Sequence, residues 1–270
     1  MLGAGLALQH AARLYSMAMT PQSSPVRTAT VELTVNGRRF GLRVTVPDRP
    51  VRPAELLPAY RSISEQLTAI AVKDVEGAGF KISCKAGCGA CCRQLVPISP
   101  IEARELVKVI ERMPEPRRTE VRRRFSAVRQ ALQQAGLLER LADPRHAREG
   151  RALSEEYWRL RLPCPFLENE SCSIYPDRPI ACREYLVASP AGHCAEPTSV
   201  NVRALPLPAG PVPVRIPHHE RNADGTPADW VALTLSPDFV ASNPSEPPPR
   251  PATELVGEFF ADAPIPPPRT

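Results

Sequence analysis

The chain has 270 residues, of which 43% are hydrophobic and 23% charged, so it is long enough and apolar enough to bury a globular core. It contains 33 prolines but only 7 Phe, 5 Tyr and 2 Trp, which indicates that part of the chain is not tightly packed. The formal charge is +5, yet only four of the 34 basic residues are lysines, and such an arginine bias can reflect codon composition. Charge alone therefore does not indicate a nucleic-acid partner, and we expect none.

Residues 1–27 predict an irregular or weakly helical lead-in. Gln9, His10 and Arg13 interrupt its apolar stretch, which argues against an export signal. No other stretch approaches the roughly 18 apolar residues that a membrane helix needs, so we expect no membrane partner. We expect the protein to act in the cytoplasm, where clustered cysteines favour metal or redox chemistry over disulfides.

A β-hairpin is predicted next. The stretch TVELTVNGRRFGLRVTV, residues 30–46, alternates apolar and polar positions on both sides of Asn36 and Gly37. Apolar residues then recur at helical spacing from Leu56 to Ile70, which predicts a helix that leads to the first cysteines.

Three helices are predicted after the first cysteines. Ser99-Pro100-Ile101-Glu102 has the form of a capping box and predicts a helix that continues to about Met113. A longer helix is predicted over residues 117–142, with an apolar stripe that includes Ala135 and Leu138. Six of its arginines could bind an anion, but no aromatic residues are interleaved with them, so we interpret them as a solvated face: Arg117, Arg118, Arg122, Arg123, Arg124 and Arg129. The third helix is short and covers SEEYWRL, residues 154–160.

The chain changes character at Pro197, because 17 of the last 74 residues are prolines. The stretch ADWVALTLSPDFV could add a strand or a packed arm, whereas SEPPPRP and IPPPRT predict polyproline-type or disordered chain. The overall prediction is an α+β fold: a mainly helical small domain organised around a cysteine-metal centre, with an N-terminal β-hairpin and a Pro-rich C-terminal arm. We divide the chain into the lead-in 1–27, a cysteine-cluster domain 28–196 with its metal-binding core at 80–195, and a partly disordered arm 197–270.

Eight cysteines carry the strongest chemical signal, and all of them lie between residues 84 and 194. Random core cysteines would scatter along the chain, whereas a metal site concentrates them in the segment that folds around it. A disulfide framework is the weaker alternative, because the chain exceeds the usual size of such scaffolds. We predict all eight as metal-binding residues: Cys84, Cys88, Cys91, Cys92, Cys164, Cys172, Cys182 and Cys194.

The spacing of the first block, CKAGCGACCR, restricts how these thiols are shared. Cys84, Cys88 and Cys91 can converge in a turn of small residues. The side chains of Cys91 and Cys92 tend to diverge, so one of the two is expected to reach a second site, a bridging position or a packing role. Eight thiols fit two four-sulfur sites, or one cluster plus one structural ion. Iron-sulfur and zinc both accept four thiolates. We favour an iron-sulfur cluster slightly, because the thiols lie in glycine-rich turns without histidine at zinc-finger spacing.

Together with CPFLENESCSIYPDRPIACREY, residues 164–185, the first block resembles the YkgJ-type cysteine-cluster family, a zinc- or iron-chelating domain with a C-x2-C-x2-C-C signature. The resemblance covers about residues 80–195 and departs where three residues, instead of two, separate Cys84 from Cys88. It implies metal chelation by these cysteines. Some relatives act in protein-lysine methylation of flagellin, which makes a part in methyl transfer an alternative.

Two other functions stay open, and whether the protein is an enzyme is uncertain. The spacing C-x3-C-x2-C also occurs in radical enzymes, but these place it after the first strand of a strand-helix barrel. The second open function is that of a structural zinc module, which would contact a protein partner through the prolines and the basic helix. Near the cysteines, Arg178, Arg183 and Tyr185 could donate hydrogen bonds to sulfur or bind an anion, and His193 is a minor ligand candidate.

Overall fold

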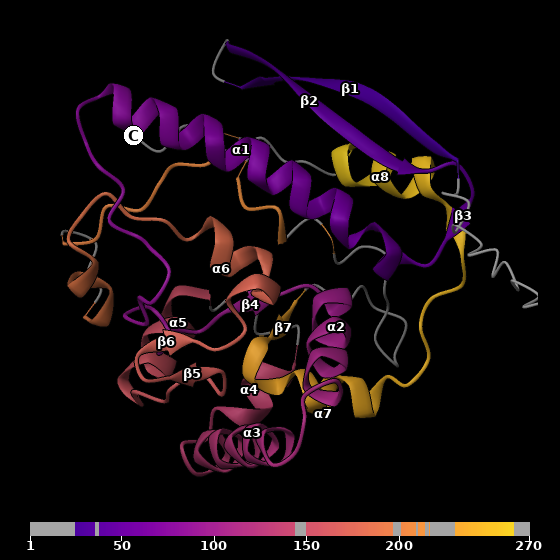
Figure 1. Ribbon diagram of the computed structural model, residues 1–270. Helices are drawn as coiled ribbons and strands as arrows, with labels where there is room; N and C mark the ends of the chain where they lie inside the picture. Colours follow the sequence, from indigo (N-terminus) through magenta and orange to yellow (C-terminus); the bar gives the residue numbers. More distant parts are fainter. Residues whose placement is uncertain are drawn as a thin grey trace, which may run out of the picture.

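The computed structural model describes residues 25–261, with gaps at 36–37, 144–149, 197–200, 209, 214–215 and 217–229. Most of the lead-in and the predicted hairpin turn lie outside the described residues. The hairpin lies over one long helix, α1 (Leu57–Gly77), with the last helix of the chain on the same side, and most of the other helices lie on the opposite side of α1 (Figure 1). Helices and small antiparallel sheets together agree with the predicted α+β class. Among the described helices, none is long and apolar enough to cross a membrane.

The predicted hairpin is confirmed by β1 (Val26–Val35) and β2 (Arg38–Pro47), which pair antiparallel along their whole length. Alternate residues of β2 are buried, since Leu42, Val44 and Val46 face inward while their neighbours are exposed. This is the pattern expected of a strand with one face on a core and one in water.

The first core lies between the hairpin, α1 and the last helix, α8 (Ala252–Ala261). Tyr60 of α1 is fully buried, and its ring centroid lies 5.1 Å from that of Phe259 in α8. A 3-10 helix, Pro53–Leu56, precedes α1. The sequence did not predict α8, because prolines surround its short apolar stretch.

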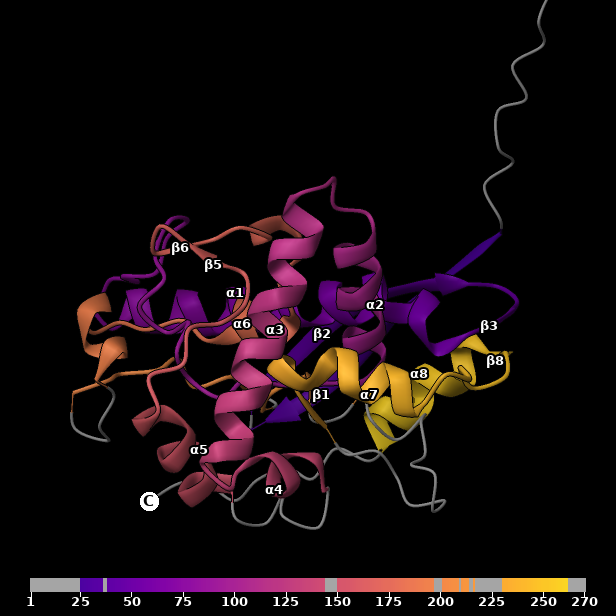
Figure 2. The ribbon, with the colours of Figure 1, turned by 90° about the horizontal axis from the view of Figure 1, so that it is seen from below.

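A second core surrounds α2 (Pro100–Glu111), which begins at the predicted capping box: Ser99 accepts a hydrogen bond from the Glu102 N–H. Helix α3 (Arg117–Gln134) lies beside α2, and α7 (Ser236–Ser242) also contacts α2 (Figure 2). A third core brings together α3, α4 (Leu138–Ala142) and α5 (Gly150–Arg159), which covers most of the predicted short helix.

The prediction of one continuous helix over residues 117–142 is wrong, because α3 ends at Gln134 and α4 begins at Leu138. Gly136 adopts a positive φ of 70°, a left-handed conformation that ends helices and that glycine adopts without strain. The break changes which side chains are buried: Leu137 is buried, whereas Leu138 is only partly buried and Ala135 is exposed.

Short two-stranded sheets join segments that are far apart in sequence. Strand β3 (Pro50–Val51) pairs with β8 (Arg250–Pro251), and β4 (Pro97–Ile98) pairs with β7 (Val231–Ala232). Strand β7 continues into a 3-10 helix, Leu233–Leu235. A local pair, β5 (Leu167–Glu168) and β6 (Ser171–Cys172), forms a tight hairpin in the second cysteine block. Residues 230–261, within the segment expected to form the Pro-rich arm, thus contribute strands and helices to these cores.

Candidate metal centre

The eight cysteines lie mainly in turns and short elements, and Cys164 and Cys172 pack against the second core. The first four follow α1 and precede β4, while Cys172 ends β6 and Cys182 lies in the five-residue helix α6 (Ile180–Glu184). A 3-10 helix, Tyr175–Asp177, precedes α6, and a second one, Ala191–Ala195, contains Cys194. All eight are free thiols, and all are buried or partly buried.

One cavity of about 340 Å³ brings thiols of both sequence blocks together. Apolar side chains such as Phe166 and Leu233 form much of the rest of its wall. Thiolate sulfur is the ligand that zinc and iron-sulfur clusters both take, so this donor set fits either group. The cysteines that line the cavity are Cys88, Cys91, Cys92, Cys164, Cys172 and Cys182.

The two blocks are joined through close backbone contacts. The Cys164 N–H donates a hydrogen bond of 2.7 Å to the Cys92 carbonyl. Gly89 lies against the β5–β6 turn, where a Cβ atom built on it would come within 2.5 Å of the Glu170 carbonyl oxygen. Glu170 also forms a 2.6 Å ion pair with Arg93. Only glycine allows this approach, which explains why a small residue separates the cysteines here.

Hydrogen bonds join Cys84 and its neighbour to the segment that follows α6. The Val187 N–H donates to the Cys84 sulfur at 3.3 Å, and the Ser83 N–H donates to the Val187 carbonyl at 2.9 Å. Burial raises the pKa of Cys84, while the hydrogen bond from Val187 favours its thiolate and opposes that shift.

The adjacent pair Cys91 and Cys92 is asymmetric. The Cys92 thiol donates a hydrogen bond to the Cys91 sulfur, which lowers the pKa of Cys91 and raises that of Cys92. The positive charge of Arg178, which also lines the cavity, further lowers the pKa of Cys91. Cys91 is therefore the thiol most easily ionised in this pair.

Electrostatic effects between thiols define a first group. Burial raises the pKa of Cys194 to about 11, and negative charge on Cys91, Cys84 or Cys88 adds to that shift. Cys91 and Cys88 likewise add to the burial that raises the pKa of Cys84. We call Cys84, Cys88, Cys91 and Cys194 the loop set.

A second group lies entirely on the cavity wall. Burial raises the pKa of Cys164 to about 12, and charge on Cys172 and Cys91 adds to it. Burial also raises the pKa of Cys182 well above its ordinary value, with contributions from Cys164, Cys91 and Cys172, so Cys91 acts on both groups. The hydrogen bond to its neighbour and burial raise the pKa of Cys92, and charge on Cys164 and Cys182 adds to this shift. We call Cys92, Cys164, Cys172 and Cys182 the cavity set.

Other predicted neighbours differ in their relation to the cavity. Arg178 and Tyr185 line it, and the Arg178 guanidinium lies 4.0 Å above the Tyr175 ring. Arg183 instead donates hydrogen bonds to the carbonyls of Arg178 and Pro176.

The imidazole of His193 is exposed, and its Nδ1 lies 2.8 Å from the Asn201 carbonyl, so the structure places this minor ligand candidate at the surface.

The sequence did not single out Glu184, a buried carboxylate on the cavity wall. It accepts hydrogen bonds from Ser64 Oγ at 2.8 Å and from the Val212 N–H at 3.2 Å. Its position two residues after Cys182, in the same short helix, was the available signal. Within the part of the chain that the structure describes, no group of three or more His, Cys, Asp and Glu side chains could hold a metal ion as placed.

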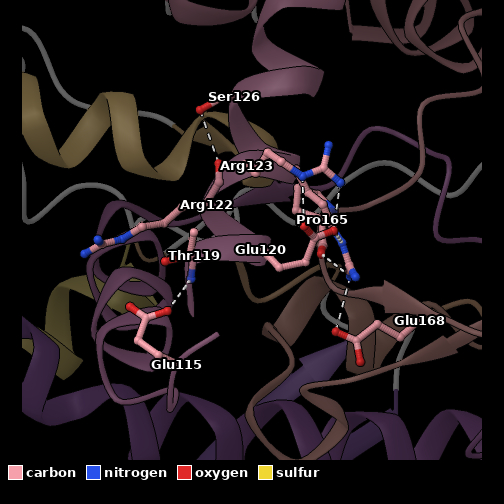
Figure 3. A network of polar contacts seen from close by, with 9 residues as sticks. Glu115, Thr119, Glu120, Arg122, Arg123, Ser126, Pro165 and Glu168 are labelled. Atoms are coloured by element: carbon pink, nitrogen blue, oxygen red, sulfur yellow. Dashed lines mark hydrogen bonds and ion pairs between the residues drawn. The ribbon is translucent and has the colours of Figure 1, made fainter. Parts of the chain in front are cut away.

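The arginines of α3 form ion pairs within the chain (Figure 3). Arg123 and Arg124 both pair with Glu120, at 2.8 and 3.0 Å, and Arg124 also reaches Glu168 at 3.2 Å. Arg123 and then Arg124 lower the pKa of Glu120 to about 2. Further pairs on α3 are Arg118–Glu115, Arg122–Glu111 and Arg129–Asp238. These pairs favour the interpretation of α3 as a solvated face.

Comparison with known proteins gives one result. The family described as "CxxCxxCC: Putative zinc- or iron-chelating domain" matches residues 83–201, which confirms the resemblance drawn from the cysteine blocks. No curated protein and no solved structure matches the chain significantly. The matched segment contains all eight cysteines.

Proposed function

We propose that the CxxCxxCC domain of this chain binds metal through two four-thiolate sites, with an iron-sulfur cluster held by the cavity set. The observation that carries the proposal is that six thiols from both sequence blocks, among them all four of the cavity set, line one cavity of about 340 Å³. Four thiolates are the usual ligands of an iron-sulfur cluster, and such a cluster supplies one-electron transfer when bound.

The loop set is proposed as the second site. Cys91 acts electrostatically on Cys84 and Cys194 and also on Cys164, Cys172 and Cys182. We assign it to the loop set because the cavity set already has four thiols without it. This division separates the adjacent cysteines, because Cys91 serves one site and Cys92 the other. It agrees with the tendency of neighbouring side chains to diverge.

The protein's own groups support thiolate formation at both sites. Arg178 lowers the pKa of Cys91, and its charge also opposes the burial that raises the pKa of Cys172. The Val187 N–H stabilises negative charge on Cys84. Hydrogen bonds and positive charge of this kind orient metal ligands and tune the site. Because thiols in this state require a reducing environment, we place the protein's action in the cytoplasm.

The test is metal and acid-labile sulfide analysis, with a visible absorption spectrum, on protein purified without oxygen. We expect iron and sulfide in matched amounts, lost in Cys164→Ser and kept in Cys84→Ser. A colourless protein with zinc at both sites would show that the bound metal is zinc instead of an iron-sulfur cluster. Chelation by the thiols would still stand. Unchanged metal stoichiometry in both variants would refute chelation by these thiols.

A structural zinc module is the second candidate, favoured by the position of the cysteines in turns and short elements. Metal removal would then unfold the domain, and the Pro-rich segment after residue 197 would contact a protein partner. A part in protein-lysine methyl transfer is a separate hypothesis, tested with a labelled methyl donor and lysine-rich protein.

The radical-enzyme hypothesis loses support, since the described strands form two-stranded antiparallel sheets instead of a parallel barrel.

A further inference from the structure

A larger groove, of about 840 Å³, lies next to the cysteine cavity. One of its walls is the face of α1 that carries Ser64, Thr68 and Lys73, and the other comes from Arg178, Arg183 and Leu186 around α6. Figure 1 shows α6 beneath α1, and the two helices are in contact. Arg178 lines both the groove and the cysteine cavity and so forms part of the wall between them.

Two residues of this groove have buried donor atoms without a partner. Thr68 Oγ1 and Arg178 Nε are both inaccessible to solvent and make no hydrogen bond. Buried donors are satisfied in most proteins, so two that lie in one groove call for an explanation. A ligand that presents several acceptor oxygens would supply partners for such donors once their side chains turn toward the groove.

The charge around these donors is positive. Arg61 and Arg178 lie close enough to Arg183 for their charges to repel its own. Arg183 has one ion pair, a loose contact of 3.9 Å with Glu65, whose side chain is 65% exposed. The Nε atom of Arg61 is also buried without a partner.

Glu65 and Glu76 also line the groove, on the α1 wall with Lys73 and opposite Arg178 and Arg183. With Arg61 close by, the basic residues outnumber the carboxylates. A dianion offsets the repulsion among the arginines better than a monoanion does, and guanidinium groups bind phosphate in a two-pronged geometry.

We propose that this groove binds a phosphomonoester, whose phosphate lies against Thr68 and the arginines of the α6 wall. The groove is much larger than a phosphate group, and Ala69, Val72 and Leu186 give it an apolar wall. The organic part of the ester packs along these side chains. The site is distinct from the thiol sites and does not depend on which metal they hold.

The experiment measures binding of inorganic phosphate and of phenyl phosphate to the metal-loaded full chain by calorimetry at constant ionic strength. Thr68→Val keeps the shape of the side chain and removes the unpartnered donor. Arg178→Gln removes the charge, and its metal content is measured in parallel because Arg178 also lines the cysteine cavity. Matched controls are Thr253→Val, on the exposed side of α8, and Arg151→Gln, on α5.

We expect saturable binding of phenyl phosphate, at least as tight as that of inorganic phosphate. The affinity should fall about tenfold or more in Thr68→Val and in Arg178→Gln, because each loses a hydrogen bond to a charged group. Both controls should keep the affinity of the unmodified chain. The proposal is overturned by a lack of saturable binding, by an equal loss in the controls, or by binding of inorganic phosphate alone.

Discussion

The backbone N–H of Ile180 donates a 2.7 Å hydrogen bond to the buried carboxylate of Glu102, which joins the first turn of α6 to that of α2. The same carboxylate accepts from the Ser99 N–H at 3.1 Å and so completes the capping box of α2. Cys182 follows Ile180 by two residues, so Glu102 helps to position a cavity-set thiol without contacting metal.

Glu102→Ala should destabilise the protein by about 2 kcal/mol, since it leaves the buried N–H groups of Ile180 and Ser99 without an acceptor. Metal content should fall as well, because α6 loses its cap. Urea unfolding of the two proteins measures the change in free energy. The exposed pair Arg112–Glu105 provides the control, and Glu105→Ala should change stability by less than about 0.5 kcal/mol. An equal effect of both substitutions would contradict this prediction.

Burial also raises the pKa of Glu102 above its ordinary value of 4.5. Between that value and the higher folded pKa, the folded state binds more protons than the unfolded state. The contribution of Glu102 to stability therefore decreases as pH rises through this window. Unfolding free energies of metal-free protein, measured across the window, should fall less steeply with pH in Glu102→Gln than in the unmodified chain. Parallel slopes would rule out this contribution.

Gly89→Ala should disrupt the contact between the two cysteine blocks. A Cβ atom at this position would lie 2.5 Å from the Glu170 carbonyl oxygen and 2.6 Å from Leu167 Cδ1, so backbone must move. We expect a loss of about 1–3 kcal/mol in unfolding free energy, as for other overpacked sites, together with lower metal content. Gly192→Ala is the control, because nothing lies within 4 Å of its Cβ position. Equal stability of the two variants would show that the blocks do not approach as described.

The adjacent cysteines should be separable by mutation. If Cys91 belongs to the loop set and Cys92 to the cavity set, Cys91→Ser keeps the cavity-set metal, whereas Cys92→Ser keeps the loop-set metal. Metal and sulfide analysis of the two variants and of the double variant measures this division. Loss of the same metal in both single variants would mean that the two sulfurs share one site.

Metal uptake should release protons and strengthen as pH rises. Burial raises the pKa of Cys164 to about 12 and that of Cys194 to about 11, so both thiols are protonated near neutral pH. Metal must displace these protons, so affinity increases with pH up to those values. Calorimetric titration of metal-free protein in buffers of different ionisation enthalpy measures the protons released. Uptake without proton release would exclude thiols as ligands.

Phe259→Ala should unfold the first core, because the ring is 1% exposed and packs on Tyr60. The expected loss is about 3–5 kcal/mol in unfolding free energy. Phe80→Ala is the control. That ring is 41% exposed, so its removal should lower the unfolding free energy far less. If the two variants unfolded alike, α8 would not be part of the core that the structure describes.

The amino-acid sequence was sufficient to predict the elements whose signals are local. Alternation of apolar residues located the hairpin, helical spacing located α1, and Ser99 with Glu102 located the start of α2. Eight clustered cysteines in two recognisable blocks likewise predicted the similarity to a zinc- or iron-chelating domain family, whose model matches residues 83–201. These features depend on residues close together in the chain, so composition and spacing are sufficient to predict them.

How distant segments meet depends on the whole folded chain, and the three-dimensional structure shows it. The structure places α8 against the hairpin and divides residues 117–142 at Gly136. It also showed Glu102 capping α6, 78 residues further along the chain. Burial and long-range hydrogen bonds are properties of the folded chain as a whole, and no local pattern encodes which partner a buried group will find.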